Sequence, residues 1–304
     1  MIQLSAVFSS HMVLQRQKNI SVWGDSDAES LKITLADKSV SVVPEQGRFQ
    51  AILPPFEAGG PYTLTVQSQT EQVVYEDVMI GEVWLAGGQS NMEFMLKDAK
   101  GGAEALQHCA ESGVRCFRVP RNTFPNAAYA QEFAESRWEL ATPETAGVWS
   151  AVAYWAAQEL AQRLGVPVGI VGCNYGGSSV SCWMSEEDLE RHAAGHPYLK
   201  DYQDAVAGKT DAEMIAAYDD YLVYHAAWTE RMEKCYQEDG NMKWDEVIRR
   251  AGPAPWASKA RFVPPVCTAS CCAGSCRTPF GDSGIIRGRT TTFGQKRMPR
   301  CSAP

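Results

Sequence analysis

Two serines of this chain lie in glycine-bearing runs that could present a nucleophile. Ser90 lies in GEVWLAGGQSNMEF, and Ser283 lies in PFGDSGII. A serine hydroxyl attacks an acyl carbon when a base takes its proton and hydrogen-bond donors hold the oxyanion that forms. The chemistry to consider is therefore acyl transfer, and the surroundings of each serine decide which one could perform it.

Ser90 has the local pattern of a nucleophile, and Ser283 does not. An apolar run ending in Gly87 and Gly88 precedes Ser90, and a predicted helix follows it. This arrangement aims the hydroxyl out of the carboxyl edge of a sheet, where α/β proteins bind ligands and backbone N–H groups can face an oxyanion. A simpler interpretation is that Ser90 only caps the helix. Ser283 lacks both the strand and the helix, so we do not regard it as a nucleophile.

The first 78 residues predict a β-sandwich-like region. Apolar and polar residues alternate in NISVWG, LKITLA, SVSVV, RFQAILP and YTLTVQS, and turn-forming residues separate these runs. The pattern indicates short strands, each with one buried face.

Residues 79–262 predict an α/β domain, because apolar strands now alternate with amphipathic helices. Residues 151–164 form a predicted helix with Ser150 as N-cap and Gly165 at its end. The residues that follow helical spacing in it are Val152, Trp155, Ala156, Glu159, Leu160 and Leu164. The next strand, VPVGIVGCNYGG, ends in a glycine turn, and residues from 186 to about 250 predict further helices.

The bulk composition argues against several classes of partner. The net charge of −8 disfavours nucleic acid or an anionic membrane surface as the partner, and no long apolar run predicts a membrane span. No basic segment precedes the first apolar residues, so a cytoplasmic location is the default expectation. The cysteine run CTASCCAGSC lacks the second pair that a zinc site needs, so we expect neither a metal nor a cofactor.

Three segments together resemble one enzyme family. GEVWLAGGQSNM is similar to the nucleophile block of the SGNH (GDSL-like) hydrolases, in the form found in sialate O-acetylesterases and related carbohydrate acetylesterases. FSSHMVLQRQKNISVWG resembles the β-rich start of that family. WSAVAYWAAQELAQRLGVPVGIVGCNYGGSSVSCWM resembles its helix–strand segment. The resemblance covers roughly residues 5–260 and implies a three-layer α/β/α domain after the N-terminal region.

The resemblance also implies an activity and roles for individual residues. It implies a serine esterase that removes O-acetyl groups from sialic acids or other acetylated sugars through an acetyl-Ser90 intermediate. The backbone N–H groups of Ser90 and Gly177 would form the oxyanion hole, and Asn174 would shape the adjacent loop. Without the resemblance, Gly177 belongs to an ordinary turn at a strand end. Relatives usually carry threonine and a carboxylate where this chain has Ser178 and Ser181, which puts the substrate contacts of this loop in doubt.

The general base is missing from the sequence pattern. The family supplies it from a C-terminal Asp-x-x-His motif after a block resembling Tyr-Gln-Gly-Glu, and neither is present here. None of the five histidines stands in such a frame, so we expect each to be a surface or packing residue: His11, His108, His192, His196 and His225.

A shift of reading frame would explain the missing motifs. A back-translation of residues 279–291, read one nucleotide earlier, can encode Thr-Leu-Arg-Gly-Leu-Trp-Tyr-Tyr-Gln-Gly-Glu-Asp-Asp, which contains the missing block. We therefore expect the frame to shift near residues 262–266 and residues 263–304 to be an aberrant, disordered tail. The nucleotide sequence across this junction decides the matter.

Three other functions stay open. The chain can be a truncated and inactive product of an esterase gene, or a carbohydrate-binding module that keeps the cleft without turnover. It can also be an SGNH lipase or arylesterase, which the resemblance outside the serine block disfavours. Comparing acetylated sugars with long-chain esters would separate the last alternative from a carbohydrate esterase.

Overall fold

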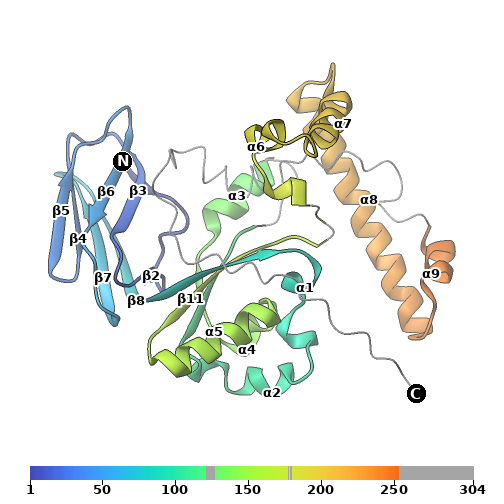
Figure 1. Cartoon of the computed structure of the whole chain (residues 1–304), viewed down its shortest axis with the longest axis horizontal. Helices are drawn as coiled ribbons and strands as arrows, with labels where there is room; N and C mark the ends of the chain where they lie inside the picture. The colour runs from blue at the N-terminus through green and yellow to red at the C-terminus, as the bar shows by residue number, and fades with distance from the viewer. Residues whose placement is uncertain (121–126, 177, 179, 253–304) are drawn as a thin grey trace. The chain divides into compact units, whose positions relative to one another are not determined.

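The computed structural model describes residues 1–120, 127–176, 178 and 180–252 (Figure 1). These residues divide into two units, which we describe separately. The first unit contains residues 1–119 and 133–176, and the second contains residues 120, 127–132, 178 and 180–252. Ser283 and the predicted tail over residues 263–304 lie outside the described residues.

The N-terminal strands follow the predicted alternation. Two sheets face each other across a core that includes Val22, Leu53, Ile33 and Leu64, and the burial of β6 alternates strictly between exposed and buried residues. This part of the sequence prediction is confirmed, since each of the five predicted runs contains a strand. The strands here are β1 (Ile2–Leu4), β2 (Val13–Gln15), β3 (Ile20–Ser26), β4 (Leu31–Leu35), β5 (Lys38–Val42), β6 (Arg48–Leu53) and β7 (Gly59–Gln67).

One long strand joins this region to the rest of the first unit. β8 (Gln72–Gly88) pairs with β7 along its first half and with β11 (Val168–Asn174) along its second half. Figure 1 shows β8 running from the N-terminal strands to a position beside β11. The resulting eight-stranded sheet contains the path β10-β9-β11-β8-β7-β4-β5. The sequence boundary between residues 78 and 79 falls inside β8.

The sheet becomes parallel where β8 meets β11, and β11 meets β9 (Val114–Arg118). β10 (Trp138–Leu140) closes the edge in antiparallel pairing with β9. Short helices follow β8 and precede α5 (Ala151–Leu164): α1 (Ser90–Glu93), η1 (Leu96–Asp98), α2 (Gly102–Gln107), η2 (Cys109–Glu111) and α4 (Pro143–Ala146). The chain is thus a mixed α/β protein with parallel and antiparallel strand pairs.

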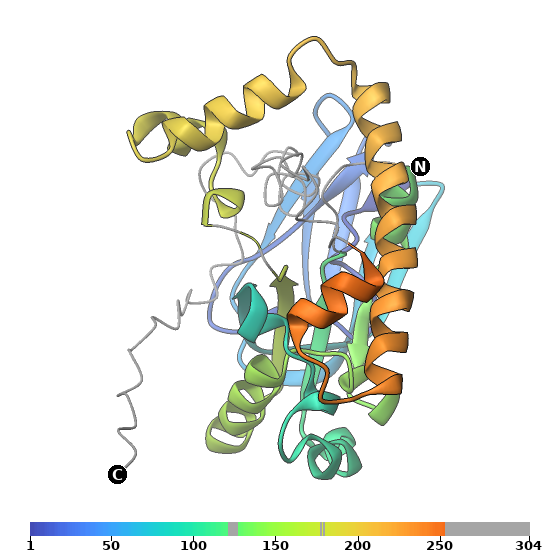
Figure 2. The same cartoon turned by 90° about the vertical axis from the view of Figure 1, so that its right-hand side faces the viewer.

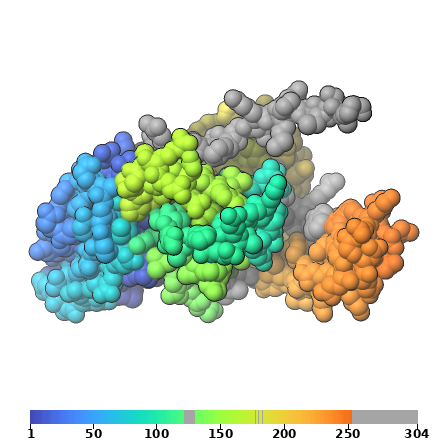
Figure 3. All heavy atoms as spheres, turned by 90° about the horizontal axis from the view of Figure 1, so that it is seen from below, coloured from blue at the N-terminus to red at the C-terminus, as the bar shows by residue number. Residues whose placement is uncertain are grey.

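Different elements pack against the two faces of the parallel strands. On one face, α5 packs against Val114, Cys116 and Ile170, and Figure 3 shows α5 and α2 over this side of the molecule. On the other face, a Cβ added to Gly169 would lie 2.8 Å from Val13 and 2.9 Å from the ring of Trp138. Within the first unit, this second face therefore contacts the N-terminal segment, and the three-layer arrangement stays a prediction.

The helix α5 has the predicted ends but a different buried face. The Ser150 hydroxyl accepts a hydrogen bond from the N–H of Ala153, and Gly165 ends the helix in the left-handed conformation. Val152 and Leu164, two of the apolar residues at the predicted helical spacing, are 39% and 45% exposed. The buried stripe consists of small residues around one large one: Ala151, Ala153, Tyr154, Ala157 and Ala161. Alanines let the helix approach the sheet closely. The close packing of this alanine face stabilises the helix more than burial of the larger apolar side chains on the opposite face would.

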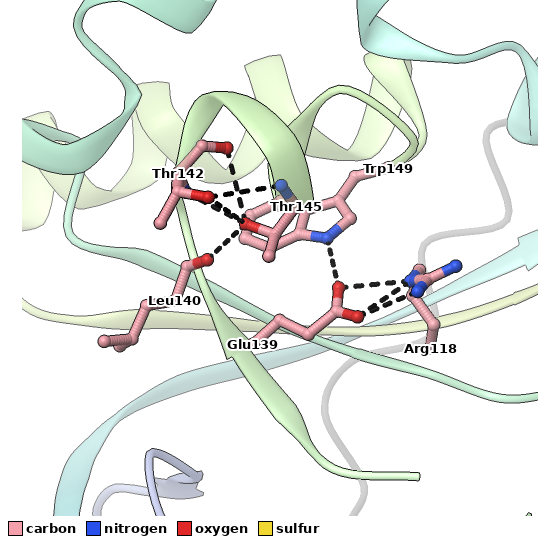
Figure 4. Close-up of polar contacts among 6 residues, drawn as sticks. All are labelled: Arg118, Glu139, Leu140, Thr142, Thr145 and Trp149. Atoms are coloured by element: carbon pink, nitrogen blue, oxygen red, sulfur yellow. Dashed lines mark hydrogen bonds and ion pairs between the residues drawn. The ribbon is translucent and has the colours of Figure 1, made fainter.

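A polar cluster connects the edge strand β10 to β9 and to the start of α5 (Figure 4). The guanidinium of Arg118, at the end of β9, donates to both oxygens of the Glu139 carboxylate, with the shortest distance 2.8 Å. The indole Nε1 of Trp149 donates to the same carboxylate at 2.7 Å. The Thr145 hydroxyl donates to the carbonyl of Leu140 and forms the cap of α4 with Thr142. The carboxylate therefore joins β9 and β10 to the start of α5.

The second unit is helical. Its elements are η3 (Val180–Trp183), α6 (Glu186–Arg191), α7 (His196–Val206), α8 (Asp211–Glu238) and α9 (Trp244–Ala251), while α3 (Ala127–Glu135) contributes its first residues. The predicted helices after residue 186 are thus confirmed. Figure 2 shows α8 and α9 side by side. They bury Trp228 and Val247 between them, and the Trp228 indole donates to the carbonyl of Gly252 at 3.0 Å. In the described part of the chain, no helix combines the length and apolarity that crossing a bilayer requires.

Candidate active site

The site predicted from the sequence lies where two parallel strands end. β8 ends at Gly88 and β11 ends at Asn174, and these two residues are partners in the register. The ladder continues for one more bond, because the N–H of Tyr175 donates to the carbonyl of Gly88 at 2.9 Å. The segments that follow the two strands, with Ser90 on one and Gly176 on the other, therefore begin at the same edge of the sheet.

Ser90 is the first residue of α1, and Gln89 is its N-cap. The Ser90 hydroxyl donates to Gln89 Oε1 at 2.8 Å, and the Ser90 N–H approaches the same oxygen at 3.4 Å. The interpretation of Ser90 as the cap is therefore wrong. Because α1 has only four residues, an oxyanion here would depend on individual N–H groups rather than on the dipole of a long helix.

The hydrogen bond to Gln89 orients the hydroxyl of Ser90 without activating it. An amide oxygen accepts a hydrogen bond but does not take up the proton near neutral pH. Ser90 is exposed, so its hydroxyl is accessible from solvent. Among the described residues, the hydroxyl is therefore bonded to an amide and not to a base.

Gly88 has a backbone conformation that allows the chain to turn from β8 into α1. Its φ is +151°, a region that other residues rarely adopt. A Cβ at this position would also lie 3.2 Å from the Cβ of Met92. Glycine at the strand end therefore serves the placement of Ser90, as the sequence interpretation supposed.

The second segment holds the other predicted site residues. Asn174 is half-buried at the end of β11, and Gly177, the predicted oxyanion donor, lies outside the described residues. In the helical unit, the Trp183 indole donates to the Ser178 hydroxyl at 2.9 Å, and Ser181 is buried. Ser181 is thus not an exposed contact for a ligand.

The thiol of Cys116 is not a competing nucleophile. Cys116, on β9, is a free and fully enclosed thiol. Burial strongly raises the pKa of this thiol, so it stays protonated at neutral pH.

A histidine–aspartate pair is present in the first unit, but at the wrong end of β8. The Nδ1 atom of His11 lies 2.7 Å from Oδ2 of Asp77. Asp77 precedes Gly88 by 11 positions in the continuous strand β8, which corresponds to about 36 Å at roughly 3.3 Å per residue. The pair therefore cannot take the proton of Ser90, in agreement with the interpretation of His11 as a packing residue.

The remaining histidines are also in surface or packing positions. His108 is exposed at the end of α2. In the second unit, the His196 ring donates to the carbonyl of Glu190 at 2.8 Å, His225 packs against the ring of Tyr221, and His192 is exposed. In the described ranges of the chain, no three His, Cys, Asp or Glu side chains gather where a metal ion could bind.

Comparisons with known proteins find sialate O-acetylesterases and a carbohydrate acetylesterase. Rat sialate O-acetylesterase is 27% identical over 218 residues, which is 66% of this chain and 40% of the rat protein. The human enzyme is 25% identical over 214 residues, with 64% and 40% covered. A crystal structure of a carbohydrate acetylesterase from Xanthomonas citri superposes with a TM-score of 0.58 at 36% identity, covering 62% of this chain and 44% of that one. The chain is a distant homologue of the sialate O-acetylesterases. It spans about two fifths of the length of the curated relatives it matches, and no family model matches it.

For this homologue of the sialate O-acetylesterases, sequence reasoning missed two neighbours of Ser90. Gln89 holds the Ser90 hydroxyl, and Glu93 lies against Gly176. The only sequence signal is position: Gln89 directly precedes Ser90, and Glu93 follows it by three residues on the same helical turn.

Proposed function

We propose that this protein is a serine esterase that removes O-acetyl groups from sialic acids or related acetylated carbohydrates. The observation that carries the proposal is the exposed Ser90 on the turn that follows β8, beside the end of β11. The homology to sialate O-acetylesterases supports the substrate class, and the match to a carbohydrate acetylesterase structure supports the acetylated sugar as partner.

In the proposed reaction, Ser90 Oγ forms a bond to the acetyl carbon, and its proton leaves. The carbonyl becomes a tetrahedral oxyanion, which accepts hydrogen bonds from the N–H groups of Ser90 and Gly177, while Asn174 shapes the loop that carries the second donor. The bond to the sugar oxygen then breaks, and the sugar leaves as an alcohol after taking up a proton. Water attacks the acetyl-Ser90 ester and releases acetate.

The reaction requires a change at Gln89. Its amide oxygen now accepts the Ser90 hydroxyl and approaches the Ser90 N–H, and the reaction needs both groups. Gln89 must therefore rotate when an ester binds. The histidine and aspartate that would activate Ser90 are not among the residues placed beside it here, so we expect slow turnover, on the order of 10³–10⁴-fold above water from binding and oxyanion contacts alone.

The proposal is tested by hydrolysis of p-nitrophenyl acetate and of an O-acetylated sialic acid by the full chain. Ser90→Ala should lower both rates, because it removes the attacking oxygen. Ser39→Ala, a change at an exposed serine of β5, should leave both rates unchanged. Undiminished hydrolysis by Ser90→Ala would refute the proposal.

A second candidate function is carbohydrate binding without turnover, by an inactive fragment of the same family. The observation that favours it is the pairing of the Ser90 hydroxyl with an amide rather than with a base. In that case the chain binds acetylated sialic acid in calorimetry, and neither the wild type nor Ser90→Ala hydrolyses it.

A further inference from the structure

The side chain of Glu93 occupies the space beside Gly176. If a Cβ is added to Gly176, its three nearest neighbours are all atoms of the Glu93 carboxyl group. The φ angle of Gly176 is not among the positive values that favour glycine. The backbone conformation therefore does not explain glycine at this position, and any larger residue would have to displace the carboxyl group of Glu93.

The backbone around Glu93 is tied to the sheet and to α5. Within α1, the N–H of Glu93 donates to the carbonyl of Gln89 at 3.0 Å. One residue later, the carbonyl of Phe94 accepts the N–H of Ala151 at 2.8 Å. One residue earlier, the sulfur of Met92 accepts the hydroxyl of Ser150 at 3.3 Å. The position of Glu93 is thus set by neighbours on both sides.

Ser90 and Glu93 lie on the same face of this turn, three residues apart. The carboxyl group therefore spans the gap between the turn that presents Ser90 and the turn that ends β11. Donors to an oxyanion must be held within a fraction of an ångström of their working positions to be effective. A side chain that fixes the spacing between the two turns would act on the reaction through them.

We propose that Glu93 is a positioning residue for this esterase, which fixes the turn at Gly176 relative to Ser90. The inference rests on the proposed function. It acts by shape, so the amide of glutamine should replace the carboxylate. If the negative charge mattered instead, it would oppose the developing oxyanion, and glutamine would raise the rate.

The test measures kcat and KM for p-nitrophenyl acetate, together with the affinity for a small alkylboronic acid, whose adduct with Ser90 mimics the tetrahedral intermediate. Glu93→Ala should lower kcat and boronate affinity by about tenfold with little change in KM, because the interaction is made in the transition state. Glu93→Gln should stay within about twofold of the wild type in both measurements, because it keeps the shape of the side chain. Glu104→Ala, at an exposed glutamate of α2, is the matched control and should change nothing.

A size exchange gives the sharpest form of the test. Gly176→Ala should lower kcat, because its methyl group displaces the Glu93 carboxyl. The double variant Gly176→Ala/Glu93→Ala should be more active than either single variant, because the methyl group fills the vacated space and the effects are not additive. Thermal unfolding shows whether each variant is folded. If Gly176→Ala does not fold, the single Glu93 variants decide the proposal.

Different results overturn different claims. The role of Glu93 would be overturned by any of three results, each of which leaves the esterase proposal intact. These are additive losses of activity in Gly176→Ala/Glu93→Ala, a wild-type rate for Glu93→Ala, and a rate above the wild type for Glu93→Gln. Undiminished turnover by Ser90→Ala would overturn the esterase proposal, and the role of Glu93 with it.

Discussion

The two ends of β8 differ in their polar side chains: a histidine–aspartate pair lies toward the amino end, and the exposed Ser90 follows the carboxyl end. At the amino end, Asp77 pairs with His11 and receives two hydrogen bonds from Arg115, at 2.6 Å to its carbonyl and 3.0 Å to its carboxylate. At the carboxyl end, Ser90 is exposed and bonded to the amide of Gln89. Among the described residues, the first end has a histidine–aspartate pair, and the second has the proposed nucleophile without such a pair beside it.

The difference shows that residue types alone do not define a site. His11 and Asp77 both adopt left-handed backbone conformations, with φ of +70° and +54°. Such conformations are costly outside glycine, at about 1–3 kcal/mol each, and persist where surrounding contacts fix them. Arg115 supplies those contacts, since it also donates to the carbonyl of His11 at 2.9 Å. The amino end is therefore organised for stability, and the carboxyl end exposes its hydroxyl.

The largest expected effect is at the amino end. Arg115→Ala removes the donor for three acceptors in a side chain that is only 14% exposed. We expect the free energy of unfolding to fall by about 2–3 kcal/mol, with no change in ester turnover of the folded fraction. Urea denaturation measures the loss. Arg163→Ala, at an exposed helical ion pair, is the control and should change stability by less than about 0.5 kcal/mol. A similar loss in both variants would contradict the role of Arg115.

An intermediate effect is expected at the carboxyl end. Gln89→Glu places a carboxylate where an amide now accepts the Ser90 hydroxyl at 2.8 Å. Because a carboxylate can take up the proton, we expect ester hydrolysis at neutral pH to rise about tenfold, or about 1.4 kcal/mol in the barrier. The gain should disappear in Gln89→Glu/Ser90→Ala.

The control for this variant is Gln107→Glu, which adds the same charge at the exposed end of α2. A rate in Gln89→Glu no higher than in Gln107→Glu would show that proton transfer from Ser90 does not limit hydrolysis. In that case, the lack of a base beside Ser90 would not be what distinguishes the carboxyl end of β8 from the amino end.

The smallest expected effect is a change in pH dependence. Partial burial would raise the pKa of Asp77, but hydrogen bonds from His11 and Arg115 outweigh it and lower the pKa below its ordinary 3.8. A carboxyl group with a depressed pKa stabilises the folded state above its unfolded pKa. That contribution is lost as the pH falls through the folded value. Asp77→Asn should therefore flatten the decline of stability below about pH 4, measured by urea denaturation at several pH values. Parallel declines in the two proteins would contradict this assignment.

Much of the fold could be predicted because side chains report their surroundings directly. Alternation of buried and exposed residues, as in Phe49, Ala51 and Leu53 of β6, indicates a strand between a core and solvent. The ends of α5 were predictable because Ser150 and Gly165 satisfy specific backbone needs. Its buried face was not predictable from large apolar residues, since close packing on the sheet selects alanine. The length of β8 was not predictable from the sequence, because its first half pairs with β7 and its second half with β11.

The place of Ser90 in the fold was predictable, but its contacts were not. The strand–glycine–serine pattern placed Ser90 at the correct edge, because parallel strands end together. The cap was not predictable. Ser90 and Glu93 have the spacing of a capping box, yet Gln89 caps the turn and Glu93 lies against Gly176. The second contact depends on where β11 ends relative to β8, which is a register between segments 86 positions apart in the chain, as in the pairing of Asn174 with Gly88.

The continuity of β8 also determines how this protein can be divided. A cut between residues 78 and 79 would leave β2 and β7 without part of their pairing partner, since Val13 pairs with Met79 and Gly59 with Ile80. Strand edges with unpaired N–H and C=O groups can pair with strands of other chains. Excision of the α/β part alone is therefore expected to yield aggregates, and a recombinant fragment should retain the whole N-terminal sandwich to remain an autonomous folding unit.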